Sequence, residues 1–383
     1  TQIACSSGNS QADNNTNSEK PAVAAVSNIK AEPAQKADSK ADIKINAVNF
    51  PSGTAYLIGM LGNQFYRADS VNYTGTSFQF KRDTPYKHGL YYVSFKDNRN
   101  FSLLLGKDQT MSIEIDGNNI LGSLKVKDCK NYELFVENSQ YEEDYKRQMY
   151  QFNQQIKSYQ AGDPNWESIN DKRTALLNER NNILNETFQR YPDLFYTAYK
   201  RAGQNPDIKD VRLPDGSVDK RTQVTFYRKE FWDGVDFSNP SLMNTPVIEN
   251  KFNKFFDQLT DQNADSVIAS ADLVLAKVMD HPKYFDYFVN AIPIKFEPAK
   301  SKLMGAEKVY THIIQNYYTY EKATWADSAT IHSLQLKAYE MAASTMGSVG
   351  PNVTSTGPDG KPYTLYDLKS DYLIVYMFSP KCE

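Results

Sequence analysis

The spacing of apolar residues in this chain changes once, near residue 130, and this change limits the folds that the chain can adopt. Up to Cys129, short runs of alternating apolar and polar residues are separated by turn residues such as Leu61-Gly62-Asn63. A period of two is typical of half-buried strands. After Asn131, apolar residues recur three, four or seven positions apart, as in an amphipathic helix. The sequence therefore predicts an all-β part followed by an α-helical part.

The predicted β part covers residues 42–130, where Gly, Asn and Asp residues between the strands can form hairpin turns. Strands are expected at Thr54–Gly59, Gln64–Val71, Ser77–Lys81, Leu90–Phe95, Phe101–Leu105 and Met111–Ile115. Short strands at this spacing are typical of a sandwich or a partly open barrel. We find no group of catalytic residues here, and we expect His88, next to Gly89, to be a solvated loop residue.

The predicted helical domain covers residues 131–349. Its first helix carries apolar residues from Leu134 to Ile156, and Asp163-Pro164 is expected to cap the second, which runs from Trp166 to Phe188. Further helices are expected at Asp193–Ala202, Thr222–Trp232, Val247–Leu259, Ala264–Met279, Tyr284–Ile292, Ala306–Tyr320 and Ser328–Ala343.

The N-terminal stretch differs in composition, since residues 6–49 contain no aromatic residue and consist largely of small, polar and charged residues. Such a stretch cannot bury enough apolar surface to offset its ordering entropy. We therefore predict a disordered tether over residues 1–41, before the β part begins at residue 42. A tether of this length would have a typical reach of roughly 35 Å.

The C-terminal stretch carries the residues most indicative of chemistry. Tyr372 to Phe378 is an unbroken apolar run, which predicts a strand covered on both faces. Ser379-Pro380 can cap and begin a helix, and Cys382 follows at once. A cysteine at the N-terminus of a helix is favoured as the thiolate, so its pKa should fall below the free value of about 8.5. Cys382 is therefore predicted to be a redox nucleophile.

This C-terminal stretch resembles the opening of a TlpA-type thioredoxin-like module. The matching pieces are Gly350-Pro351-Asn352-Val353, the Gly357-Pro358-Asp359-Gly360 turn, Leu365-Tyr366-Asp367-Leu368 and Phe378-Ser379-Pro380-Lys381-Cys382. In the family the last piece usually has the pattern Trp-x-Pro-x-Cys-x-x-Cys, so Phe378 replaces a tryptophan. The printed sequence stops one residue after Cys382, and the resemblance therefore implies a resolving cysteine beyond Glu383.

Two further likenesses extend this resemblance over most of the chain. Residues 42–130 and 131–349 resemble, in that order, the β-rich and helical domains that precede the thioredoxin module in bacterial envelope lipoproteins. Gln2-Ile3-Ala4-Cys5 resembles a lipobox, in which Cys5 would be lipidated, although Gln2 replaces the usual aliphatic residue. The expected fold is thus α+β and multidomain: a small β sandwich or barrel, a helical domain, and the first part of a thioredoxin-like α/β module at residues 350–383.

The resemblance implies an envelope thiol-disulfide oxidoreductase, anchored in the outer membrane by lipid on Cys5 and facing the periplasm or the cell surface. Cys382 would attack the disulfide of an envelope protein, Phe378 and Pro380 would shape the site, and Lys381 would favour the thiolate. No cofactor is implied. The alternative is a lipid-anchored binding or assembly component of an outer-membrane protein complex, in which the β and helical domains dock a partner. The residue at position 385 would distinguish the two, because the enzyme needs a cysteine there.

Charge and cysteine content exclude other classes of function. The net charge of −3 gives no basic surface for nucleic acid. Cys5, Cys129 and Cys382 are too far apart in sequence for a zinc site, and Cys129 is expected to be a half-buried apolar residue. His281, His312 and His332 lack a second ligand at helical spacing, so we predict no metal site.

Overall fold

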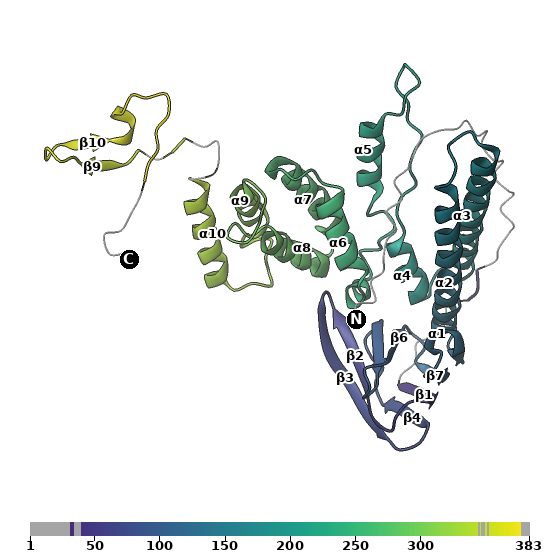
Figure 1. The fold of residues 1–383 in the computed structure, drawn as a ribbon. Coiled ribbons are helices and arrows are strands. Elements are labelled where there is room, and N and C mark those ends of the chain that lie inside the picture. The colour runs from purple at the N-terminus through teal and green to yellow at the C-terminus, as the bar shows by residue number, and fades with distance from the viewer. Residues whose placement is uncertain (1–30, 34–39, 344, 346–348, 351, 377–383) are drawn as a thin grey trace. The chain divides into compact units, whose positions relative to one another are not determined.

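A computed structural model of the protein describes residues 31–33, 40–343, 345, 349–350 and 352–376. The chain divides into two compact units, Thr1–Asn253 and Lys254–Glu383. The first contains two β-sheets and several helices, and the second is mostly helical (Figure 1). The fold is therefore α+β and multidomain, as predicted.

The β part of the first unit consists of two four-stranded sheets, with strand orders β4-β1-β7-β8 and β3-β2-β5-β6. Apolar residues on alternate positions of these strands form a common core, in which Tyr73, Phe78 and Phe95 pack ring against ring. Its strands are β1 (Ala41–Val48), β2 (Gly53–Leu61), β3 (Gln64–Tyr73), β4 (Ser77–Arg82), β5 (Gly89–Ser94), β6 (Asn100–Leu105), β7 (Thr110–Asp116) and β8 (Lys125–Lys127). The predicted sandwich is confirmed.

Strand β1 was not among the predicted strands, although it begins where the predicted tether, residues 1–41, meets the predicted β part, residues 42–130. Ala41, Ile43, Ile45 and Ala47 alternate with polar residues and are all buried. The strand lies between β4, to which it is antiparallel, and β7, to which it is parallel. Small aliphatic residues at a period of two are sufficient for a central strand, even where aromatic residues are absent.

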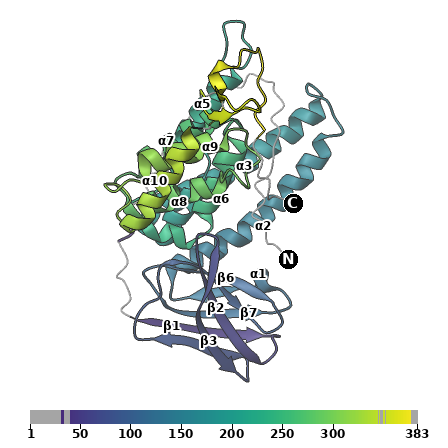
Figure 2. The same ribbon diagram turned by 90° about the vertical axis from the view of Figure 1, so that its left-hand side faces the viewer.

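The helices of the first unit are α1 (Ile120–Ser123), α2 (Lys130–Ile156), α3 (Pro164–Arg190), α4 (Phe195–Gly203), α5 (Lys220–Glu230) and the 3₁₀ helix η1 (Pro240–Asn244). Helices α2 to α5 lie near the predicted ranges, whereas α1 and η1 were not predicted. Asp163 caps α3 as expected, since its side chain accepts a hydrogen bond from Asn165 N. Helices α2 and α3 run side by side and extend together away from the sheets (Figure 2).

Buried hydrogen bonds join the β-sheets to these helices. The side chain of Asn131, at the start of α2, is 1% exposed and lies between β6 and α4. Its Nδ2 donates to Leu104 O (3.1 Å), and its Oδ1 accepts from Tyr196 N (2.7 Å). At another contact Asn244 Nδ2 donates to His88 O (2.7 Å). His88 itself is half-buried beside the Phe195 ring, so the expectation of a solvated loop residue is wrong.

The second unit is built from helices that pack through apolar faces. They are α7 (Ala264–Val278), α8 (Pro282–Lys295), α9 (Ala306–Tyr317) and α10 (Ser328–Ala342), and the division between the units falls within α6 (Val247–Gln258). Helix α9 contacts α7, α8 and α10. After α10 the unit contains the strands β9 (Thr354–Thr356) and β10 (Pro362–Thr364) and the 3₁₀ helix η2 (Leu365–Asp367).

Candidate functional site

The residues predicted to carry chemistry, Cys382 with Phe378, Pro380 and Lys381, lie outside the described residues, as does the predicted lipidation site Cys5. The segment that leads to Cys382 is described up to Tyr376. The structure therefore describes the segment before the predicted redox site, residues 352–376, here called the approach, but not the site itself.

The approach contains a hairpin at the predicted Gly357–Gly360 turn. Strands β9 and β10 pair antiparallel, and Gly357 N donates to Lys361 O (2.9 Å). Asp359 fixes the turn, because its carboxylate accepts hydrogen bonds from Lys361 N (3.1 Å) and Tyr363 Oη (2.8 Å). Gly360 has a φ of 73°, which glycine adopts without strain. The predicted turn is confirmed.

A short capped turn follows the hairpin at Leu365–Asp367. Asp367 Oδ2 accepts from Thr364 N (3.2 Å) and Thr364 Oγ1 (2.7 Å), which fixes the start of η2. Leu365 N donates to Val353 O (2.9 Å), and Tyr366 N donates to Asn352 Oδ1 (3.0 Å). These bonds hold the turn against the residues that precede β9.

The predicted strand from Tyr372 to Phe378 is wrong for residues 372–376, which form neither strand nor helix. Tyr372 and Ile374 are 90% and 94% exposed, where a strand covered on both faces would bury them. A strand forms only by pairing with a neighbour, and in the described part of the second unit no strand lies beside these residues. Residues 372–376 are therefore not covered by a neighbouring strand.

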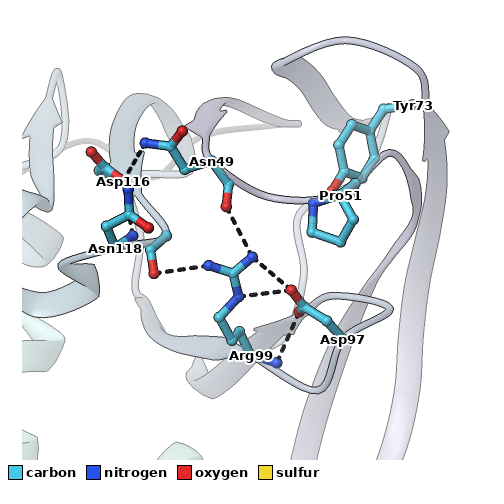
Figure 3. Close-up of polar contacts among 8 residues, drawn as sticks. Asn49, Pro51, Tyr73, Asp97, Arg99, Asp116 and Asn118 are labelled. Atoms are coloured by element: carbon cyan, nitrogen blue, oxygen red, sulfur yellow. Dashed lines mark hydrogen bonds and ion pairs between the residues drawn. The ribbon is translucent and has the colours of Figure 1, made fainter.

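In the first unit, Arg99 fixes three loops at one end of the sheets (Figure 3). Its Nε donates to Asp97 Oδ2 (2.7 Å), its Nη1 to Gly117 O (2.8 Å) and its Nη2 to Asn49 O (2.9 Å). The guanidinium also stacks on the Phe50 ring at 4.4 Å. The hydrogen bond from Arg99 lowers the pKa of Asp97. Because these interactions occupy the guanidinium, Arg99 acts as a structural clamp rather than as an anion site.

An open groove of about 650 Å³ lies near this clamp, where β2, β3 and β4 begin or end. Its lining includes Ser52, Thr54, Asn72, Tyr73, Ser77 and Phe78. Thr54 Oγ1 donates to Asn72 Oδ1 (2.6 Å), and Tyr73 Oη donates to Pro51 O (2.7 Å; Figure 3). The groove offers hydroxyl and amide groups but no charged residue, and the rings of Tyr73 and Phe78 in its lining are buried in the core. It suits binding of a neutral group rather than acid-base catalysis.

A half-buried ion cluster joins α2, α3 and α4. Glu142 pairs with Arg180 Nη2 (2.7 Å) and with Lys200 Nζ (3.5 Å), and the guanidinium lies over the Tyr145 ring. Burial acts to raise the pKa of Glu142, but the hydrogen bonds and charges of Arg180 and Lys200 outweigh it, so that the pKa is lowered. The carboxylate is therefore ionised and bound, which suits a structural contact rather than a general acid.

The second unit holds a histidine cluster that includes a carboxylate. Asp272 Oδ1 lies 2.7 Å from His312 Nε2 and accepts from Tyr317 Oη (2.8 Å). Asn316 Nδ2 approaches His312 Nδ1 at 3.4 Å, so both ring nitrogens have neighbours. Burial and the bond to Asp272 raise the pKa of Tyr317. No nucleophilic side chain is bonded to His312 among the described residues, so the cluster ties α7 to α9.

Cys129 is the one cysteine among the described residues, and it is more buried than predicted, at 1% exposed. It occupies the N-cap of α2, where its Sγ lies 3.5 Å from Asp108 O. Burial raises the pKa of the thiol, with a further contribution from the charge of Asp108. Cys129 is therefore an inert apolar residue at neutral pH.

No three His, Cys, Asp or Glu side chains of the described residues lie close enough together to bind a metal ion. Among the helices that can be described, none combines the length and the apolar character needed to cross a membrane.

Comparisons with known proteins give one family match and two solved structures. A family model described as "Domain of unknown function (DUF5106)" matches residues 166–341, less than half of the chain. No curated protein matches the sequence.

The chain has a thioredoxin-like structural neighbour, a protein from Bacteroides caccae, with 16% identity and a TM-score of 0.35 over 47% of this chain and 64% of that one. This chain thus spans less than two thirds of that protein. An NMR structure of a protein from Eubacterium rectale gives 17% identity and a TM-score of 0.15, over 25% of this chain and 93% of that one. TM-scores this low carry no argument about function.

Proposed function

We propose that the protein is a thiol-disulfide oxidoreductase of the bacterial cell envelope, anchored in the outer membrane by lipid on Cys5. The observation that carries this proposal is the local structure before Cys382. The proposal is supported by the hairpin at Gly357–Gly360, a turn that the resemblance to a TlpA-type thioredoxin-like module includes, and by the capped turn at Leu365–Asp367, which falls within the matching Leu365–Leu368 segment. The apolar run and Pro380 then lead directly to the cysteine.

In the proposed reaction, the Cys382 thiolate attacks one sulfur of a substrate disulfide. An S–S bond forms between Cys382 and the substrate, and the second substrate sulfur leaves as a thiolate. A resolving cysteine beyond Glu383 then attacks Cys382, releasing the substrate as a dithiol. The two electrons come from the cysteine pair, which a thiol-donating envelope partner must reduce again. Lys381 would favour the attacking thiolate by its charge.

The first unit supports a second candidate, a lipid-anchored binding component of an outer-membrane protein complex. The groove beside Tyr73 and Phe78 is the observation in its favour, because it offers hydroxyl and amide groups without catalytic ones. In the oxidoreductase this same surface would present a substrate or partner to the redox module. In the binding component it would be the whole function.

Trapping of the mixed disulfide distinguishes the two candidates. The full-length gene product, with the expected cysteine at position 385 changed to Ser, would be incubated with a disulfide-bonded envelope extract. Mass spectrometry after non-reducing electrophoresis should find Cys382 joined to substrate cysteines. Cys382→Ser should abolish the adducts, whereas the control Cys129→Ser should not, because that thiol is buried. If position 385 is not a cysteine, or if no adduct forms at Cys382, the oxidoreductase proposal is contradicted and the binding component is favoured.

A further inference from the structure

The sheet β3-β2-β5-β6 has an open edge along the first part of β3. Strand β3 lies at the outer side of this sheet and pairs, among the described strands, with β2 alone (Figure 1). Its residues 64–67 are all exposed. The turn before them is held in place, because Gly62 N donates to Met243 O in η1 (2.9 Å). A fixed strand with an unpaired edge can accept another strand.

The register of the β2–β3 hairpin determines which backbone groups lie at this open edge. Leu61 pairs with Gln64 across a two-residue turn, and such a closing pair exchanges both of its backbone hydrogen bonds. Hydrogen-bonded and non-hydrogen-bonded pairs alternate in an antiparallel ladder, so Phe65 and Arg67 are non-hydrogen-bonded partners of β2. The N–H and C=O groups of Phe65 and Arg67 therefore point away from β2, toward the open edge.

The open edge ends at a β-bulge. The pairing of β2 with β3 shifts by one residue, which leaves Ala68 as the extra residue of the bulge. Just beyond it, Ser70 N donates to Asp69 Oδ1 (2.7 Å), so this amide is already occupied. A strand added to β3 can therefore pair with residues 64–67 but cannot continue in register past the bulge.

The side chains beside the open edge combine an aromatic ring with a cation. Phe65 is 62% exposed, and Arg67, two positions along, lies on the same face of the strand. The Arg67 guanidinium lies over the Tyr56 ring at 5.7 Å. Tyr66 lies on the opposite face, where its ring is turned toward β2, since a Cβ at Gly59 would meet that ring at 2.6 Å. Phe65 and Arg67 are thus the side chains that a neighbouring strand would contact on one face.

We propose that two copies of the chain associate through this edge, with residues 64–67 of the two β3 strands paired antiparallel about a two-fold axis at Tyr66. In this register Phe65 of each copy lies opposite Arg67 of the other, and each such pair exchanges both of its outward backbone hydrogen bonds. A guanidinium beside an aromatic ring is a favourable contact, and the symmetry makes it twice.

The second copy is favoured over an unrelated strand because this segment is complementary to itself. A shift of the register by two residues in one direction would place the two Arg67 cations opposite each other. A shift in the other direction would pair Phe65 with itself and leave Arg67 opposite the hairpin turn. The contact is short, and interfaces below about 1,200 Å² of total buried surface are typical of transient complexes. Association should therefore be weak and depend on concentration, and it does not depend on the proposed redox chemistry.

Cysteine cross-linking of the full chain tests the register, in a background of Cys5→Ser with Cys382→Ser. Tyr66→Cys should form a disulfide-linked dimer under mild oxidation, because residues opposite each other in a non-hydrogen-bonded pair have Cα atoms about 4.5 Å apart. Phe65→Cys is the matched control and should not link to itself, since its two copies would be about 8–9 Å apart. A mixture of Phe65→Cys and Arg67→Cys chains should link, which tests the same register without changing Tyr66.

Sedimentation equilibrium of the full chain with Cys5→Ser, under reducing conditions, measures the association itself. Arg67→Pro removes the cation and an outward N–H that β2 does not use, and proline is tolerated at such edge positions. It should weaken dimerisation by at least about tenfold, because each lost contact occurs twice in the dimer. Asn72→Pro, on the same strand beyond the bulge, is the matched control and should associate as the parent does. Circular dichroism checks that each variant is folded.

The proposal is overturned if the parent chain stays monomeric at the highest concentration at which it remains soluble. It is equally overturned if Arg67→Pro and Asn72→Pro dimerise alike, because the interface would then lie elsewhere. Cross-linking of Phe65→Cys to itself, without linkage in the mixture of Phe65→Cys and Arg67→Cys, would also contradict the proposed register.

Discussion

Replacing Asn131 by alanine should strongly weaken the contact between the sheets and helices of the first unit. The change removes the side-chain partner of two buried backbone groups, Leu104 O and Tyr196 N. Each buried polar group left without a partner costs about 1–3 kcal/mol, so the loss at two groups should lower the free energy of unfolding by about 2–6 kcal/mol. Asn131→Asp should be similarly destabilising, although it is nearly isosteric, because a carboxylate oxygen would face Leu104 O.

Hydrogen-deuterium exchange followed by mass spectrometry is the suitable assay, because it reports each segment separately in a chain with two units. Amides of β6 and α4 should exchange about 30-fold faster or more, since 1.4 kcal/mol corresponds to a factor of ten. Peptides from α7 and α9 serve as an internal control. The exposed control Asn182→Ala should change exchange by less than about 0.5 kcal/mol. If amide exchange in Asn131→Ala matches exchange in this control, the hydrogen bonds of Asn131 do not hold the sheets and helices of the first unit together.

Three further predictions each concern a single residue. The lowered pKa of Glu142 means that its carboxylate stabilises the fold above the ordinary carboxyl pKa and loses this effect as the pH falls through its folded-state value. Glu142→Gln should therefore lower the free energy of unfolding by about 1–3 kcal/mol at neutral pH, and urea titrations in strong acid should show no difference. Cys129 should resist iodoacetamide in the native protein and react once urea unfolds it; rapid native labelling would contradict its burial. Gly89→Ala would place a Cβ 2.6 Å from Asn244 Cβ and should cost about 1–3 kcal/mol in thermal unfolding, whereas Gly75→Ala, with open space around it, should be neutral.

The helices and most strands could be predicted from the sequence because their information is local. Apolar spacing located α2 and α3, and Asp163 marked the start of α3. Strand β1 was missed because its small aliphatic residues continue the composition of the stretch before it. At residues 372–376 the sequence predicts a strand that the structure does not contain. Apolar character indicates that a strand could form, but not that a neighbouring strand is present to pair with it.

The contacts that fix the loops, and those that join the sheets to the helices of the first unit, could not be predicted from the sequence. Arg99 reaches Asn49 across 50 positions, and Asn131 reaches Tyr196 across 65. No local pattern distinguishes these residues from an ordinary surface Arg or Asn. Cys382 was found because a strand-like run, a proline and a cysteine are adjacent in sequence, and its role stays a prediction.

The most direct test of the proposed function is the rate at which Cys382 is alkylated as a function of pH. Iodoacetamide would be added to the full-length gene product, with the expected resolving cysteine changed to Ser, and the modified peptide quantified by mass spectrometry. We expect the rate to reach half of its maximum well below the value of about 8.5 for a free thiol. A profile that follows free cysteine would contradict the account, because Cys382 would then lack the acidic thiolate that exchange requires.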